Sequence, residues 1–417
     1  MRIRMASFSW PVAAMVFVFA SGAPAAAQQV IKLADGETLT ISGFISATLF
    51  NDRGLFGQFG QGQNAEWAAQ AQPGADQGFT DGDVRNTRIR FEFASQPMLG
   101  KWAPKGIIEA DFFGAFSNAP LGPPFGDEQP QLRVRLAYAD LTNGRTTLRI
   151  GQYWSPLFAE VPVSLTHIAF PLGYGAAGMV GWRFPGIFFY HDLGKAGKPM
   201  TTQLQVAVMK GSGPAVGAID VANNIGNGEA SGMPQLEARL NVGNRGKNLS
   251  WNVYVVGHLD WKDTTGTGVI GSNATGNGVE LGGNITPGHL TVHGNFYFGK
   301  GLGAQFGHIT PSQAPASATV PQQARIHGFG AWAQAGYDFT PHWSLWVFYG
   351  LDQPNNSKFF TETAANLLRQ LNHDGDFLVR YRAGRYAIGL EYFRAVTRWS
   401  TGITNADQYA ISMLHTF

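Results

Sequence analysis

Sixteen segments of this chain alternate polar and apolar residues. Side chains of a strand point to opposite faces in turn, so alternation of this kind predicts strands with one apolar face. The pattern is clearest in 37–50, 84–95, 131–142 and 145–153. The other predicted strands lie near 105–113, 182–191, 200–210, 234–242, 248–261, 277–286, 288–299, 324–339, 342–351, 375–382, 385–394 and 407–417.

The connections between these segments are long and short in strict turn. Long polar connections are expected near 51–83, 114–130, 154–181, 211–233, 262–276, 300–323, 352–374 and 395–406. Short turns such as Asn143-Gly144 and Ala383-Gly384 lie between them. A barrel that crosses a membrane has tight turns at one end and longer loops at the other, whereas a soluble sandwich does not sort its loops by length. The predicted fold class is therefore all-β, a transmembrane antiparallel up-and-down β-barrel of about sixteen strands.

The closing segment supports a barrel. Its apolar face ends on an aromatic residue and consists of Tyr409, Ile411, Met413, His415 and Phe417. A strand needs a partner for its backbone hydrogen bonds, and within a membrane every such group must be paired inside the protein. We therefore expect this strand to pair with the first one, near 38–50, and both termini to lie at the short-turn end.

The N-terminal residues 1–27 have the pattern of a cleaved secretory signal peptide. Arg2 and Arg4 precede an apolar run from Trp10 to Ala20, and three alanines end the segment. A membrane-spanning helix is the alternative, but the run is shorter than the ~20 residues that a span needs. Residues 28–417 then form a single transmembrane barrel domain. Without the two arginines its formal charge falls from +2 to zero, so nucleic acid is not an expected partner.

A basic cluster is the strongest candidate for function. We predict a pore-lining group on four consecutive strands, consisting of Arg88, Arg90, Glu92, Glu109, Asp111, Arg133, Arg135 and Arg149. A charged side chain that faces lipid at the membrane midplane costs about 2–4 kcal/mol, so these residues should face the lumen. Arginine suits carboxylate and phosphate, which favours a basic strip that helps anionic solutes across. The equally supported alternative is a ladder of ion pairs that braces the wall.

Residues 154–181 are less polar than the other long connections, with Glu160 as their one charged residue. A loop exposed to water does not normally hold so many apolar residues. We therefore expect this segment to fold into the lumen and constrict the pore. The alternative is that it packs on a neighbouring subunit.

Other chemistry is not indicated. The chain has no cysteine, and its ten histidines show no metal-ligand spacing. No G-x-S-x-G elbow is present. We expect no catalytic residues, no cofactor and no metal.

Several segments resemble a known family. The runs LTISGFISATLF, DVRNTRIRFEF, GIIEADFFGAF, LRVRLAYADL and LRIGQYWSPLF resemble the first five strands of the DcaP-like trimeric outer-membrane porins. The resemblance implies a sixteen-stranded homotrimer that passes small, preferably anionic, organic molecules, with arginines at the constriction. Some members carry a coiled coil before the barrel, and residues 28–37 are too short for one.

The predicted function is passive diffusion of small hydrophilic, anionic solutes through a water-filled pore in the outer membrane of a Gram-negative bacterium. The expected partners are outer-membrane lipid, small anionic solutes and two further copies of the chain. Two other classes stay open. One is a barrel-embedded lipid hydrolase, and the other is a structural or adhesive barrel with a plugged lumen.

Overall fold

The computed structural model describes residues 29–33, 36–57, 62–98, 100–114, 130–194, 197–214, 218–246, 248–263, 273–307, 309, 325–355 and 369–417. The predicted signal peptide lies outside these residues. The strands are β1 (Gln29–Lys32), β2 (Thr38–Arg53), β3 (Gly78–Asp83), β4 (Arg88–Ala94), β5 (Ala103–Asp111), β6 (Arg133–Asn143), β7 (Thr146–Trp154), β8 (Arg183–Asp192), β9 (Met200–Met209), β10 (Gln235–Arg245), β11 (Leu249–Asp263), β12 (Asn273–Pro287), β13 (Leu290–Lys300), β14 (His327–Asp338), β15 (Trp343–Pro354), β16 (Arg369–Ala383), β17 (Tyr386–Trp399) and β18 (Gly402–Thr416). Short helices are η2 (Gly62–Asn64), α1 (Ala218–Asn223), α2 (Asn227–Ala230) and η3 (Leu302–Gln305).

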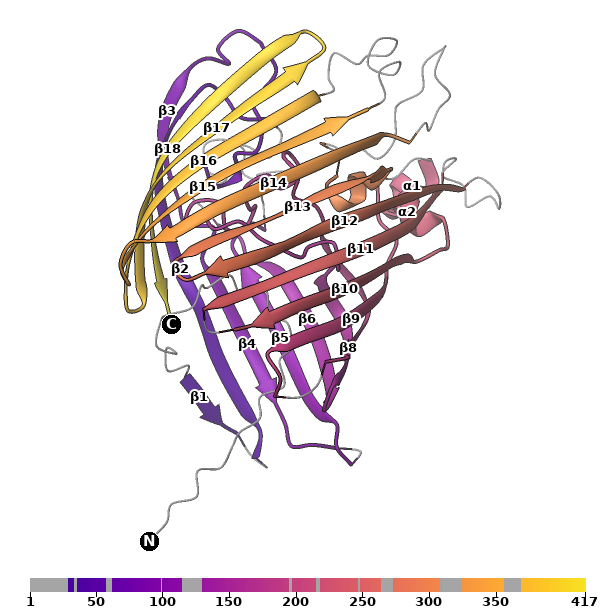
Figure 1. The fold of residues 1–417 in the computed structure, drawn as a ribbon. Coiled ribbons are helices and arrows are strands. Elements are labelled where there is room, and N and C mark those ends of the chain that lie inside the picture. The colour runs from indigo at the N-terminus through magenta and orange to yellow at the C-terminus, as the bar shows by residue number, and fades with distance from the viewer. Residues whose placement is uncertain are drawn as a thin grey trace.

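One closed antiparallel sheet contains all of these strands (Figure 1). Two of these eighteen strands, β1 and β3, do not count as separate strands of the barrel wall. β3 and β4 pair with different parts of the same edge of β2 and so form one interrupted wall strand, while β1 pairs with β2 beyond the end of β18. The wall therefore has sixteen strands, which confirms the predicted fold class.

The barrel closes between the last strand and the first, as predicted. β18 pairs with β2 from Phe44 to Arg53. At the end of the chain Phe417 and Gly43 exchange two backbone hydrogen bonds of 3.0 and 3.2 Å. The closure brings together residues that are far apart in the sequence. For example, the hydroxyl groups of Thr48 on β2 and Ser412 on β18 share a hydrogen bond of 2.7 Å.

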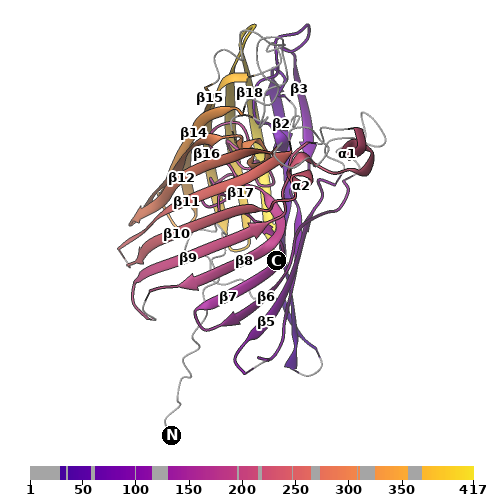
Figure 2. The same ribbon diagram turned by 90° about the vertical axis from the view of Figure 1, so that its right-hand side faces the viewer.

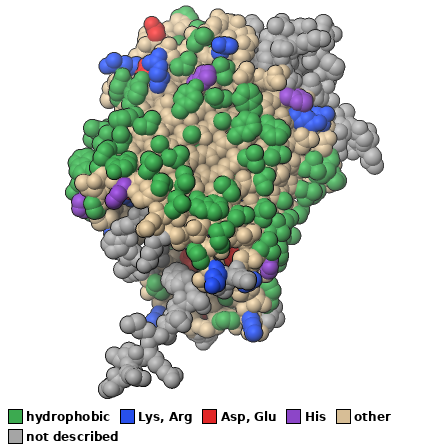
Figure 3. Space-filling view, in the orientation of Figure 1, with side chains coloured by type: hydrophobic (Ala, Val, Ile, Leu, Met, Phe, Trp, Pro, Cys, Tyr) green, Lys and Arg blue, Asp and Glu red, His purple; other side chains and the backbone are tan. Residues whose placement is uncertain are grey.

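The wall has an apolar outer face, as the alternation predicted. On the closing strand, Ile411 and Met413 are exposed on the outside, whereas Ala410 and Ser412 are buried on the inside. Figure 3 shows hydrophobic side chains spread over the outer face of the front strands, with Lys and Arg mostly near the two ends. Such a belt buries its apolar surface in lipid, and the polar side chains face the lumen.

Two predicted long connections differ in the structure. The stretch near 51–83 contains η2 and β3. The connection near 395–406 is wrong, because β17 continues to Trp399 and β18 begins at Gly402. Here the outward face mixes Arg398 and Asn405 with Ile403, and the apolar residues Ala395, Trp399 and Ala406 face inward, so polar and apolar residues no longer alternate. Parts of several other long connections lie outside the described residues.

The helices lie at the same end as the long connections, and α1 and α2 project beside the wall there (Figure 2). Within the described residues, no helix has the length and apolar character to cross a membrane.

Candidate functional site

The eight residues predicted to line the pore lie on β4 to β7, which are consecutive wall strands. Arg90, Glu109, Asp111, Arg135 and Arg149 are buried inside the barrel. The other three, Arg88, Glu92 and Arg133, are partly buried. The strand order therefore brings together side chains that are up to 61 residues apart in the sequence, from Arg88 to Arg149.

Glu109, at the centre of this cluster, contacts three arginines. The Nε of Arg88 and the Nη1 of Arg90 each lie 3.7 Å from its carboxylate oxygens, and the Nε of Arg135 donates a hydrogen bond of 3.0 Å. One carboxylate thus offsets only part of the charge of three guanidinium groups.

Asp111 is the second carboxylate of the cluster. Arg133 binds it with both Nε and Nη2, at 2.9 and 2.7 Å, and the Nη1 of Arg135 donates to it at 2.8 Å. Bidentate pairs of this kind are geometrically specific. Together with the Glu109 contacts they support both sequence hypotheses, since the ion pairs brace the wall and still leave an excess of positive charge. Glu92 lies outside this group and pairs with Lys105 at 2.8 Å.

A β-bulge in β6 changes which residues face inward. The register between β5 and β6 shifts between Glu109 and Ala110, so Arg135 and Leu136 both point into the barrel. Leu136 therefore faces the interior, whereas regular alternation from Val134 would place it on the outer face. A bulge adds one residue to one strand and reverses the facing of every later residue. Asp140 becomes an inward residue for this reason.

Arg149 on β7 is held by Asp140 and by aromatic rings. Its Nε and Nη2 donate to the two carboxylate oxygens of Asp140 at 2.7 and 2.8 Å. The guanidinium carbon lies 3.9, 3.8 and 5.2 Å from the ring centres of Tyr138, Tyr153 and Tyr190. This arginine is fully engaged in the wall, unlike those around Glu109.

Arg183 at the start of β8 is a further member of the cluster, which its sequence pattern does not reveal. It is buried beside the rings of Trp154 and Trp182, at 4.8 and 4.3 Å, and the Trp154 ring also lies 5.6 Å from the guanidinium carbon of Arg135. Among the described residues it forms no ion pair. Its segment begins with closely spaced aromatic and glycine residues, which obscured the alternation.

The segment between β7 and β8, residues 155–182, lies inside the barrel. Its apolar residues form interior clusters with inward side chains of the wall, such as Val163 and Leu165 with Phe44 and Leu414. Its backbone is also held by polar wall residues, of which Glu391 accepts hydrogen bonds from Leu165 and Thr166 at 3.1 and 2.9 Å. Further polar contacts come from Glu237, Arg239, Asn252, Asn284, Asn295, Gln334, Asn372 and Ser412.

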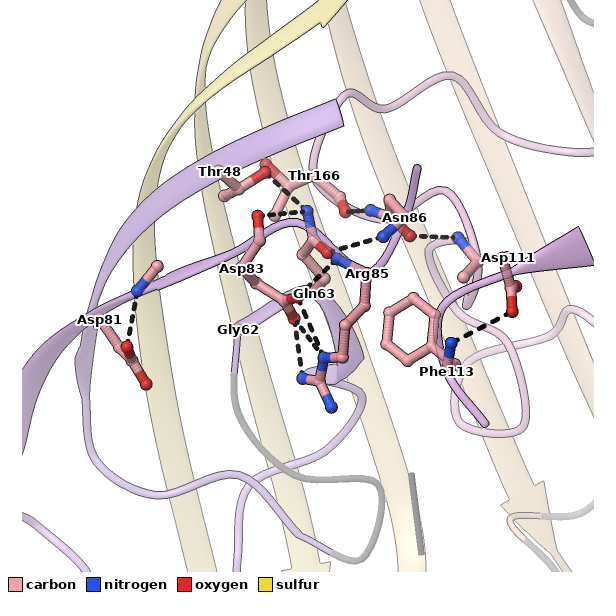
Figure 4. A network of polar contacts seen from close by, with 12 residues as sticks. Thr48, Gly62, Gln63, Asp81, Asp83, Arg85, Asn86, Asp111, Phe113 and Thr166 are labelled. Atoms are coloured by element: carbon pink, nitrogen blue, oxygen red, sulfur yellow. Dashed lines mark hydrogen bonds and ion pairs between the residues drawn. The ribbon is translucent and has the colours of Figure 1, made fainter. Parts of the chain in front are cut away.

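The first long connection and the β3–β4 interruption help to hold this inserted segment (Figure 4). Gln63 donates to the hydroxyl of Thr48 at 2.9 Å and accepts from the backbone of Asn86 at 3.3 Å. Asn86 in turn donates to the Thr166 carbonyl at 2.7 Å and accepts from the Ala169 backbone at 2.9 Å. The interruption between β3 and β4 thus places Asn86 against the inserted segment.

A cavity of about 160 Å³ lies between the basic cluster and the inserted segment. Its lining includes Arg88, Arg90, Arg135 and Arg380 from the wall, and residues 161–165, 167 and 168 from the inserted segment. A larger hollow of about 990 Å³ is bordered by outward-facing side chains of β9 to β14, so it belongs to the outer surface and not to the lumen.

Comparisons with known proteins identify the fold. No model of a known protein family matches the sequence, and no curated protein matches it. The outer membrane channel DcaP of Acinetobacter baumannii is 17% identical, with 93% of this chain and 99% of that chain covered and a TM-score of 0.69. The anion-selective porin from Comamonas acidovorans is 10% identical, with 91% and 100% covered and a TM-score of 0.54.

The OmpF structure from Salmonella typhi is 11% identical, with 93% of this chain and 100% of that chain covered and a TM-score of 0.56. Identities this low carry information on the fold alone. The resemblance noted in the sequence is confirmed at that level. The chain has the sixteen-stranded barrel fold of known outer-membrane channels, DcaP among them.

Proposed function

We propose that the protein is an outer-membrane diffusion channel that passes small anions. The observation that carries the proposal is the charge of the wall beside the inner cavity. Four guanidinium groups, of Arg88, Arg90, Arg133 and Arg135, share the two carboxylates of Glu109 and Asp111. Fixed positive charge in a narrow lumen attracts anions and repels cations. The anion-selective porin of Comamonas acidovorans has the same fold, which supports the proposal.

In this proposal the inserted segment, residues 155–182, forms the constriction. It narrows the lumen beside the basic cluster, so a solute must pass close to the arginines. The free-energy cost of losing hydration is then small for solutes whose carboxylate or phosphate accepts hydrogen bonds from the guanidinium groups. We assign no catalytic step to any residue.

The proposal includes export and assembly. Residues 1–27 direct the chain out of the cytoplasm and are cleaved, and three copies assemble in the outer membrane. A Vibrio cholerae OmpT structure of the same fold, with a TM-score of 0.52, is of a trimer form. Light scattering of the purified protein in detergent measures the copy number, and a monomer would contradict the assembly.

Conductance in planar bilayers tests transport. We expect discrete current steps and, in a salt gradient, a reversal potential that shows anion preference. Cation preference would leave the barrel intact as a channel but would overturn the role of the basic cluster.

A double variant tests the cluster itself. An anion ~4 Å from a guanidinium gains about 1 kcal/mol in water, so Arg133→Ala with Arg135→Ala should lower the anion-to-cation permeability ratio about fivefold or more. The matched control is Arg53→Ala with Arg398→Ala, which removes the same charge from the outer face and should leave the ratio unchanged. An equal effect of both pairs would contradict the assignment. If the first pair fails to fold, the glutamine pair at the same positions serves instead.

A plugged barrel is the second candidate, because the inserted segment contacts wall strands on several sides. A protein that is folded, as judged from a gel band that shifts on heating, but gives no current steps would establish the plugged barrel and exclude the channel. The lipid hydrolase alternative predicts release of fatty acid from phospholipid vesicles, whereas a channel releases none.

A further inference from the structure

The connection that follows β13 also enters the barrel. Its first residues, 301–307, fold against the ends of the inserted segment, and we call them the strap. The strap contains η3 and follows β13 at the end of the barrel with the long connections (Figure 1). Leu302 is buried there and packs with Leu157 and Val180 of the inserted segment. The sequence predicts only a long polar connection at this point and does not reveal the inward fold.

Gln305 of the strap holds both ends of the inserted segment. The two ends are joined to each other, because the Ser155 amide donates to the Trp182 carbonyl at 2.8 Å. The Gln305 carbonyl accepts from the Gly181 amide at 2.7 Å, and its side-chain oxygen accepts from the Ser155 hydroxyl at 3.4 Å. The side-chain amide of Gln305 donates to Gln235 on β10. The strap is therefore fixed to the wall and to the inserted segment at once.

Phe306 places its ring against two rings of the inserted segment. Its ring centre lies 4.9 Å from that of Tyr174, at an interplanar angle of 25°, and 4.8 Å from that of Trp182. Gly175 makes room for the ring, since an added Cβ there would lie 3.1 Å from its Cδ1. The backbone of Phe306 is left-handed, with a φ of 59°. A bulky residue keeps this strained conformation only where its surroundings hold it, which points to a function for the ring.

The Trp182 ring connects the strap to the basic cluster. The guanidinium carbon of Arg183 lies 4.3 Å from the centre of this ring and 4.8 Å from that of Trp154. The two tryptophan rings meet edge to face, with centres 6.0 Å apart. Trp154 lies 5.6 Å from the guanidinium carbon of Arg135 and lines the inner cavity. A chain of packed side chains thus runs from the strap to two arginines, and such chains transmit displacements.

We propose that Phe306 is a positioning residue for ion selectivity. Its ring fixes Trp182, and Trp182 holds the guanidinium of Arg183 in the basic cluster. Arg183 is buried, and its Nε and Nη1 have no hydrogen-bond partner among the described residues. Its place is therefore set by packing on ring faces and not by a carboxylate. The inference rests on the proposed channel function, because selectivity is a property of a conducting pore.

The alternative is that the Phe306 ring only fills space beside the inserted segment. Its loss would then lower the stability of the barrel and leave Arg183 where it is. Glycine at this position separates the two roles, because glycine adopts a left-handed backbone without strain and carries no ring. Phe306→Gly therefore removes the ring and also relieves the strain of the backbone.

The anion-to-cation permeability ratio, taken from the reversal potential of planar bilayers in a salt gradient, tests the proposal. A guanidinium ~4 Å from an anion in water favours it about fivefold, so Phe306→Gly should lower the ratio by about twofold to fivefold. Phe306→Tyr keeps the ring and should keep the wild-type ratio. Asn224→Gly is the matched control, because it relieves a left-handed residue, with a φ of 57°, in the exposed connection between α1 and α2. This control should also keep the wild-type ratio.

Crystal structures of wild type and Phe306→Gly measure the positioning directly. We expect the Arg183 guanidinium of the variant to leave the Trp182 ring, from which its carbon lies 4.3 Å in the wild type. An unchanged permeability ratio would overturn the proposal, as would a lowered ratio with Arg183 still on this ring or an equal loss in Asn224→Gly. If Phe306→Gly does not fold, Phe306→Ala takes its place. A wild type without anion preference would overturn the proposed function as well, whereas failure of this inference alone leaves the wild type anion-selective.

Discussion

At the residue scale, the arginines of the lumen wall differ in how completely they are paired. Arg149 is matched by one carboxylate and surrounded by three tyrosine rings. Arg88 reaches only a shared carboxylate at 3.7 Å, and its Nη2 is buried without a hydrogen bond to a described residue. A fully engaged cation stabilises the wall, whereas a partly engaged one is free to attract a solute.

This difference predicts unequal costs of removing the two arginines. Arg149→Ala leaves Asp140 buried without its partner, which typically costs about 3–5 kcal/mol of the free energy of unfolding. Arg88→Ala leaves Glu109 with two other arginines and should cost much less. Urea unfolding of each variant in lipid vesicles, followed by tryptophan fluorescence, measures both. A loss for Arg149→Ala no larger than that for Arg88→Ala would show that the Asp140 pair does not stabilise the wall.

The eight residues expected to face the lumen lie on the strands where the alternation placed them, while Asp140 and Arg183 were missed. The first was missed because the bulge in β6 depends on how β5 and β6 pair, which no local pattern encodes. Arg183 was missed because the aromatic residues near it hide the alternation of polar and apolar residues along β8. The alternation of polar and apolar residues predicts which side of the wall a residue faces only where the strand has no bulge or interruption.

At the element scale, the inserted segment lies close to the wall because glycines occupy the points of contact, on the wall strand and on the segment itself. Gly350 on β15 faces inward, and a Cβ added there would lie 2.3 Å from the carbonyl oxygen of Ala177. Gly178 comes as close to β14, because its added Cβ would lie 2.3 Å from the backbone of Ala331. The segment is therefore in backbone contact with two neighbouring strands.

Gly350→Ala should push the inserted segment away from β15 and toward the basic cluster on the opposite wall. The cavity beside Arg88 and Arg135 narrows, so we expect a lower single-channel conductance in planar bilayers. Gly257→Ala is the matched control, since a Cβ at this strand glycine meets nothing within 4 Å. If the two variants conduct alike, the segment does not set the width of the pore.

At the scale of the whole molecule, most of the architecture follows from the sequence. The strand number, the closure between first and last strands and the inward charges follow from alternation and loop length. The strand extensions near Trp399 and Gly402 do not, because polar and apolar residues no longer alternate there. β1 is likewise too short to be found by its pattern.

Closure of the barrel depends on Gly43, where β2 contacts both β4 and the end of the chain. A Cβ at this position would lie 2.1 Å from the Arg88 carbonyl oxygen. Gly43→Val should therefore prevent closure, and the variant should lack the compact, SDS-resistant band that shifts on heating. Gly375→Val, where an added Cβ meets nothing within 4 Å, should keep this band. A heat-modifiable band from Gly43→Val would mean that β2 and β4 accommodate the side chain.

The short strand β1 covers what the last strand does not reach. β18 stops pairing with β2 at Phe44, and the next backbone pair is that of Phe417 with Gly43, so the edge from Thr38 to Ile41 is paired by residues Gln29–Lys32 instead. A bare edge is a template on which a foreign strand can add. A protease that trimmed the chain past Lys32 would therefore leave the wall intact but open four residues of β2 to association with other chains, whereas a chain that keeps Gln29–Lys32 has this edge covered.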